Sequence, residues 1–242
     1  AREAGDAARE MHAAAQAGAV LFGMDAAPKA LEYYSTALAA AQSLGRDLAA
    51  CSYRLRLGDI LLANGEIDPA VEQFEQALET ASTLGEPRAE LESLNALLRA
   101  AISADRPALA NLYGRNVLSL ARELGDEATE ITTLDLFSLY LVEQEQYARA
   151  LPHLERGIAL ADAYEEWGWQ YPLAERLGFV HYQLGEPEQA LVHYRQARTL
   201  AERLQEDATV ARLLGRIGAA QADLGQTAEA VATLQEALAL AQ

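Results

Sequence analysis

The sequence predicts an all-α solenoid built from six helix-turn-helix repeats. The main observation is a pattern that returns at every fortieth position without a slip, marked by two columns of alanine and by a column that is usually large and apolar. The third copy departs from the last column, with Gly114 in place of the large side chain. The first alanine column is Ala30, Ala70, Ala110, Ala150, Ala190 and Ala230; the second is Ala41, Ala81, Ala121, Ala161, Ala201 and Ala241; the large residues are Tyr34, Phe74, Leu154, Tyr194 and Leu234.

These columns lie on one face of the second helix of each copy. Together with a small residue such as Ala37 or Ala77, they follow the spacing i, i+4, i+7, i+11. Leucine-glycine pairs upstream mark the first helix, and glycines after each helix favour the left-handed residue that ends it. Two helices per copy give about twelve antiparallel helices in one repeat domain, 1–242. The six units are approximately 6–45, 46–85, 86–125, 126–165, 166–205 and 206–242, and we expect the chain to be part of a longer protein.

Composition limits the classes of partner. The 242 residues carry 36 acidic and 19 basic side chains, a net charge of −17, so phosphate repulsion excludes nucleic acid as a direct partner. Cys51 is the single cysteine, which rules out an internal disulfide and is compatible with a reducing compartment. The most apolar stretch, 13–27, is too short and too interrupted to span a membrane, and no secretory signal is visible. We expect a cytoplasmic location.

The chain resembles the tetratricopeptide repeat family over essentially its full length. The residues that carry the resemblance are Leu57-Gly58, Ala70, Phe74 and Ala77 in the second copy, and the equivalent set in the fifth. The usual tryptophan of the first helix is absent, and the period is 40 rather than 34. That length is similar to the extended variety in bacterial sensor proteins, such as the sensor domain of maltose-regulator transcription activators. HEAT and armadillo repeats also run near this length, but the alanine, aromatic and small columns argue against them.

No constellation of residues favours catalysis or a cofactor. His153 and His193 occupy the same position in successive copies, so they should lie too far apart to share a metal ion. His181 falls on a position that packs against the second helix. The neighbouring Glu165 and Glu166 point apart on a helix and favour a helix start rather than acid-base chemistry. We therefore predict a binding protein with no catalytic residue, metal site or cofactor.

The resemblance implies a ligand groove along the concave face of a right-handed superhelix, lined by the first helices. Carried over by register, the mixed acidic and apolar groove would suit a peptide or protein with basic and apolar residues. The alternative is that the apolar members pack between helices and that the acids are solvated. The family's lysine-based clamp for a C-terminal carboxylate is disfavoured, because Lys29 is the only lysine. The groove residues are Asp59, Leu62, Glu92, Asn95, Arg99, Asp135, Leu139, Glu175, Phe179 and Tyr182.

An aromatic segment and the last helix are secondary candidates. Trp167, Trp169 and Tyr171 form either a contact surface or a cover over the join between the fourth and fifth copies, with Pro172 delaying or kinking the helix start. The outer face of the apolar final helix, 228–242, is expected to be covered by further chain, by a second copy or by a partner, and the second case is self-association through the terminal repeats. The predicted function is an interaction scaffold, or the sensor arm of a signalling protein. The alternatives are a small-molecule-sensing domain of a transcription regulator and a self-assembly module.

Overall fold

The computed structural model describes the backbone of residues 2–164 and 167–241, and the side chains of residues 5–164 and 168–241. Its helices fall into two compact units, residues 1–126 and 127–242, the N-terminal and the C-terminal unit. The N-terminal unit contains α1 (Arg2–Gly23), α2 (Ala27–Ser43), α3 (Asp47–Ala63), α4 (Ile67–Leu84), α5 (Pro87–Ser103) and α6 (Pro107–Leu124). The C-terminal unit contains α7 (Glu127–Glu143), α8 (Tyr147–Ala163), α9 (Trp167–Gln183), α10 (Pro187–Arg203), α11 (Asp207–Asp223) and α12 (Thr227–Leu240).

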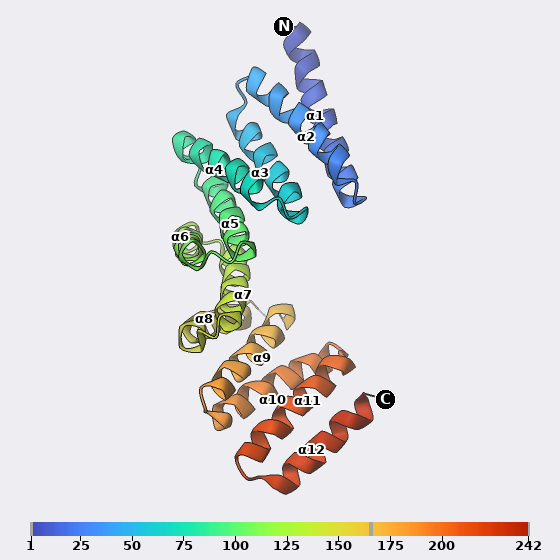
Figure 1. Cartoon of the computed structure of the whole chain (residues 1–242), viewed down its shortest axis with the longest axis vertical. Helices are drawn as coiled ribbons and strands as arrows, with labels where there is room; N and C mark the ends of the chain where they lie inside the picture. The colour runs from blue at the N-terminus through green and yellow to red at the C-terminus, as the bar shows by residue number, and fades with distance from the viewer. Residues whose placement is uncertain (1, 165–166, 242) are drawn as a thin grey trace. The chain divides into compact units, whose positions relative to one another are not determined.

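Each unit is a run of three helix pairs of an α-solenoid. Consecutive helices within a unit lie side by side and alternate in direction (Figure 1). The twelve helices confirm the predicted fold class, and the described residues include no strand. The odd-numbered helices are the predicted first helices, and the even-numbered helices are the predicted second helices.

A left-handed residue follows most of the helices at a regular interval, half of the repeat period. At Gly45, with φ of 60°, the amide of Arg46 bonds to the Ala41 carbonyl at 2.9 Å, and the amide of Gly45 bonds to the Gln42 carbonyl. This is the Schellman pattern, which satisfies carbonyls that the helix leaves free. The sequence predicted this turn only where it carries glycine. The structure adds four turns in which the residue with positive φ is not glycine: Asp25, Asp105, Glu145 and Gln205.

The alanine and large columns form the core, as the sequence predicts. Ala30, Ala70, Ala110, Ala150, Ala190 and Ala230 are all buried, as are the large residues of α2, α4, α8 and α10. Phe74 is fully buried, and its ring fills the space beside Gly58 of α3, where a Cβ would lie 2.3 Å from the ring. Gly178 and Tyr194 repeat this arrangement between α9 and α10. Glycine in the first helix therefore allows the ring of the second helix to pack.

The second helix of the sixth copy, α12, exposes apolar side chains at positions that are buried or partly buried in the other copies. Leu234, which occupies the ring position, is 45% exposed, and Val231, Leu238 and Leu240 of α12 are exposed as well. Among the described helices of its unit, α12 packs on α11. The expectation that something covers this face remains a prediction. In the part of the chain that the structure describes, no helix combines the length and apolar character of a membrane span.

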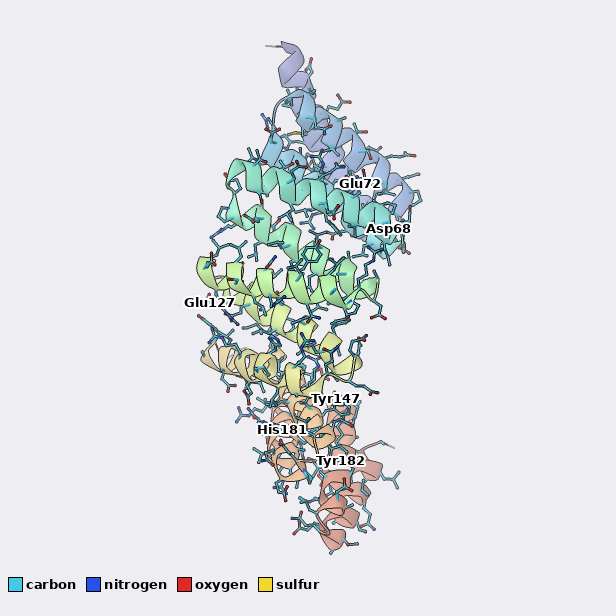
Figure 2. All side chains as sticks on the ribbon, turned by 60° about the vertical axis from the view of Figure 1, so that its left-hand side comes forward. Asp68, Glu72, Glu127, Tyr147, His181 and Tyr182 are labelled. Carbon is cyan, nitrogen blue, oxygen red and sulfur yellow. The ribbon has the colours of Figure 1, made fainter. Side chains whose placement is uncertain are left out.

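Two histidines from neighbouring helices stack in the C-terminal unit. The rings of His181 on α9, labelled in Figure 2, and His193 on α10 lie nearly parallel with centroids 5.2 Å apart. His181 Nδ1 lies 2.7 Å from Glu186 Oε2, and the ring is largely buried, as its position predicted. Burial, and then the neighbouring His181, lower the pKa of His193 below its ordinary value of 6.5, whereas Gln196 and Glu155 act in the opposite direction.

This pKa shift predicts a loss of stability at mildly acidic pH. The folded state binds a proton at His193 less readily than the unfolded state does. The contribution of neutral His193 to the free energy of unfolding is therefore complete above pH 6.5 and decreases as the pH falls from 6.5 toward the lowered pKa of the folded state. The His193→Gln variant should lose part of this dependence. Urea unfolding at a series of pH values checks it, with the exposed His12→Gln as the control. Equal pH dependence of the wild type and the His193→Gln variant would contradict the prediction.

Candidate binding groove

In the part of the chain that the structure describes, odd-numbered helices alone line one hollow in the N-terminal unit and another in the C-terminal unit. In the N-terminal unit, α3 and α5 line a hollow of about 160 Å³. In the C-terminal unit, α7, α9 and α11 line a hollow of about 270 Å³. The even-numbered helices contribute no lining residue to either, so these hollows lie on the helices that the sequence predicted to carry the groove.

The hollow of the N-terminal unit is small and charged. Asp59 on α3 is its centre: its carboxylate lies 3.1 Å from Arg56 Nη1 and 2.7 Å from Arg99 Nη2 of α5. Glu92 and Asn95 also line the hollow. Two guanidinium groups thus face two carboxylates, and this hollow has no net charge of its own. The residues that line it are Leu55, Arg56, Asp59, Glu92, Asn95, Ala96 and Arg99.

The hollow of the C-terminal unit combines an apolar wall with arginines. Leu139 on α7, which is 37% exposed, forms the apolar wall together with Val142, Pro172 and Phe179. The Phe179 ring is held from one side by Tyr147 of α8, labelled in Figure 2, whose ring centroid is 6.1 Å away in an edge-on arrangement. The remaining lining residues are charged: Glu175, Arg176, Arg212 and Arg216.

Carboxylates and arginines alternate between the three odd helices of this unit. Asp135 on α7 forms an ion pair with Arg176 on α9, which also lies 3.4 Å from the Ser138 hydroxyl. One helix further on, Glu175 forms ion pairs with two arginines of α11, Arg212 and Arg216. We call these five charged residues the arginine ladder. Its two carboxylate-to-arginine steps, 135 to 176 and 175 to 216, have the same offset in the sequence, one position more than the repeat period.

The guanidinium of Arg216 is fixed by aromatic rings as well as by charge. Its central carbon lies 5.2 Å from the centroid of Phe179 and 5.9 Å from that of Tyr194. Such cation-π contacts orient the group and strengthen as water is excluded. Arg216 therefore contacts both Phe179, which lines the hollow, and the buried ring of Tyr194 in the core.

The structure brings together most of the predicted groove residues and separates three of them. Asp59, Glu92, Asn95 and Arg99 line one hollow, and Leu139, Glu175 and Phe179 line the other. Leu62 instead packs against the core that includes Phe74. Asp135 pairs with Arg176 without lining the hollow. Tyr182, labelled in Figure 2, lies beside the Asp223 carboxylate of α11, which raises the pKa of its hydroxyl.

Three carboxylates of the predicted groove are paired within the protein. Asp59, Asp135 and Glu175 were expected to attract a basic partner, but each is already paired with arginine. A carboxylate that is neutralised within the protein contributes little attraction at a distance. The predicted preference for basic residues loses its physical basis at these three positions.

The aromatic segment lies partly outside the described residues. Residues 165–166 and the side chain of Trp167 are not among them. Trp169 lines a separate hollow of about 330 Å³ with Tyr164, Glu127 and Ile131. Tyr171 is half-buried, and α9 begins at Trp167 and includes Pro172, so Pro172 does not delay the helix start; the alternative, a kink at Pro172, stays a prediction. Neither role of the aromatic rings, contact surface or cover, is tested by these positions.

The arginines of the ladder were not predicted from the sequence, although a signal was present. Arg56, Arg176 and Arg216 share one position of the repeat, and in the C-terminal unit a carboxylate stands one position earlier in the preceding copy. Adjacent first helices bring such positions together. Among the described residues, no group of three or more His, Cys, Asp and Glu side chains is placed to hold a metal ion.

The repeat pattern also defines the family. The sequence model for the tetratricopeptide repeat matches residues 10–83 and 171–242, more than half of the chain. The chain belongs to the tetratricopeptide repeat family. This confirms the resemblance seen in the sequence, and this repeat typically serves as a non-catalytic scaffold for protein interactions. No curated protein matches the sequence.

Solved structures of tetratricopeptide repeat type share the fold at low sequence identity. BtubC (BKLC) from P. vanneervenii aligns with a TM-score of 0.73 and 17% identity, covering 89% of this chain and 91% of that one. A signal transduction ATPase of the STAND class from Pyrococcus horikoshii, with a tetratricopeptide repeat sensor, aligns with a TM-score of 0.75 and 13% identity, covering 87% of this chain but 32% of that one. YrrB, described as having an unusual peptide-binding site, aligns with a TM-score of 0.58 and 18% identity, covering 78% and 84%.

Proposed function

We propose that this protein is an interaction scaffold that binds a peptide or protein segment along its odd-numbered helices. The observation that supports the proposal is the hollow of the C-terminal unit, which three successive first helices line with an apolar wall and charged groups side by side. The exposed Leu139 and the partly buried Val142, beside arginines, provide both burial and orientation for a bound chain. The peptide-binding site in the name of YrrB supports the same use of the fold. Binding of this kind suits a scaffold or the sensor arm of a larger signalling protein.

The test is selection of a random peptide library displayed on phage, followed by affinity measurements with the selected peptides. In the groove variant, Leu139→Gln and Val142→Gln replace the apolar wall without adding charge. The control variant, Val192→Gln and Val231→Gln, changes exposed valines on the even helices α10 and α12. We expect the groove variant to bind the selected peptides about tenfold more weakly, because it loses the burial of apolar surface. The control should bind as the wild type does.

Two results would overturn the proposal. One is a selection that enriches no sequence on the wild-type protein. The other is a set of peptides that bind the groove variant as tightly as they bind the wild type. Circular dichroism of each variant, compared with the wild type, separates a loss of binding from a loss of folding.

A further inference from the structure

The hollow of the C-terminal unit has a positive local charge in a strongly acidic protein. Its lining includes three guanidinium groups and one carboxylate, whereas the whole chain carries a net charge of −17. Asp135 balances Arg176 from outside the lining, which leaves Arg212 and Arg216 to share Glu175. The arginine ladder therefore has one positive charge more than its carboxylates neutralise.

The single carboxylate cannot satisfy both arginines of α11. Glu175 is 8% exposed, and it is contacted through one oxygen, Oε1, by both Arg212 Nη1 and Arg216 Nε. Each guanidinium has five N–H donors, and the contacts within the described residues leave several of them on both groups. Burial, and then the neighbouring Arg216, lower the pKa of the Arg212 guanidinium, while Tyr171 acts in the opposite direction. Two like charges are thus held close together around one counter-ion.

The comparison with the N-terminal unit shows that this surplus is not general to the fold. There, Asp59 is likewise shared by two arginines, but Glu92 adds a second carboxylate to the same lining. The apolar lining also differs: Leu55 and Ala96 in the N-terminal unit, against Leu139, Val142, Pro172 and Phe179 in the C-terminal unit. Of these two hollows, the one in the C-terminal unit combines surplus positive charge with the more extensive apolar wall.

We propose that this hollow binds an acidic side chain, aspartate or glutamate, of the bound peptide, next to an apolar side chain that packs on Leu139 and Val142. The proposal rests on the proposed function and specifies the chemistry of the partner. A second carboxylate would accept hydrogen bonds from Arg212 and Arg216 and remove the surplus charge, and arginine favours such paired contacts with carboxylates. Arg216 is held by Phe179 and Tyr194, so the half-exposed Arg212 is the group that reorients toward the ligand.

The experiment uses the same phage library on three proteins: the wild type, a site variant and a control variant. The site variant is Glu175→Gln, Arg212→Gln and Arg216→Gln, which replaces the whole cluster by neutral amides and leaves no buried charge unpaired. The control is Arg198→Gln, Glu202→Gln and Glu236→Gln, which removes an arginine with two carboxylate partners on α10 and α12. Circular dichroism verifies the fold of both variants.

We expect peptides selected on the wild type and on the control to be enriched in aspartate or glutamate close to an apolar residue. The site variant should lose the acidic enrichment. In a synthetic peptide from the wild-type selection, replacement of the acidic residue by its amide should weaken binding about tenfold or more, as the loss of a charge-assisted hydrogen bond does. The same replacement should have no effect on binding to the site variant.

Other outcomes would overturn the inference, and they differ from those that overturn the proposed function. Selected peptides that depend on Leu139 and Val142 but lack acidic residues would leave the scaffold proposal intact and refute the acidic preference. Acidic peptides that the site variant retains would place the preference elsewhere on the protein. Peptides that lose binding only when a synthetic C-terminus is amidated would assign the site to a terminal carboxylate and contradict the proposed side-chain recognition.

Discussion

The Phe74→Ala variant is expected to lower the free energy of unfolding by about 3–5 kcal/mol, the typical cost of deleting a buried ring. Phe74 is fully buried against α3 and α5, in a core that includes Cys51, Ala77 and Leu97. Because the facing residue is Gly58, no neighbouring side chain is available there to fill the space that the ring leaves. Urea unfolding followed by circular dichroism measures the loss. Val231→Ala, at an exposed position, is the control, with an expected change within about 0.5 kcal/mol.

The pairing of Gly58 with this ring can be tested by a double-mutant cycle. Alone, Gly58→Ala places a methyl group 2.3 Å from the Phe74 ring and should cost about 1–3 kcal/mol through overpacking. In the Phe74→Ala background the same methyl group enters the cavity, and the higher helix propensity of alanine favours it by about 1 kcal/mol. The effect of Gly58→Ala should therefore change sign. A Gly58→Ala variant as stable as the wild type would contradict this packing.

The even-numbered helices were predictable because their packing is steric and repeats in most copies, the third copy with Gly114 being the exception. A ring of one helix needs a glycine or other small residue opposite it, as Phe74 needs Gly58, so the same residue types return once in each period. The helix turns were predictable only where glycine marks them. Asp105 and Glu145 occupy the same left-handed position in their copies without the residue type that signals it.

The groove residues were predictable by position but not by role. The position that carries Asp135 and Glu175 carries Leu55, Asn95 and Gly215 in other copies, so no residue type recurs there. What a charge at this position does depends on the residue that the next odd helix places beside it. The carboxylates of the groove were therefore predicted to be available to a basic partner. The offset that pairs them with arginines, one position longer than the repeat period, emerges only when adjacent helices are packed.

Breaking one of the ion pairs of the arginine ladder would leave a charge without its partner, so a variant made to test binding can also change folding. The side chains of Asp135 and Arg176 are 20% and 16% exposed, so removing either partner leaves a charge that is mostly buried and uncompensated. Any groove variant that removes one member of such a pair changes both stability and the charge of the surface. For this reason, a test of binding is clearest when it neutralises the members of a cluster together.

The second large effect is therefore expected from breaking this pair. Arg176→Leu should lower the free energy of unfolding by about 3 kcal/mol, because it strands the Asp135 carboxylate, and Asp135→Leu should have a similar effect. The double variant with leucine at both positions should recover to within about 1 kcal/mol of the wild type, since no buried charge remains. Urea unfolding of the four proteins measures the coupling.

The control is the pair of Asp68 and Arg106, whose side chains are 80% and 44% exposed at a separation of 2.7 Å. Asp68 is labelled in Figure 2, and Arg106→Leu should cost less than about 1 kcal/mol, because an exposed pair is screened by water. If Arg176→Leu lowered the free energy of unfolding no more than Arg106→Leu does, the pair of Asp135 and Arg176 would behave as an exposed surface ion pair. A costly Arg176→Leu that the double variant rescues would instead show that Arg176 compensates the Asp135 carboxylate, a role different from the ligand contact proposed for Arg212 and Arg216.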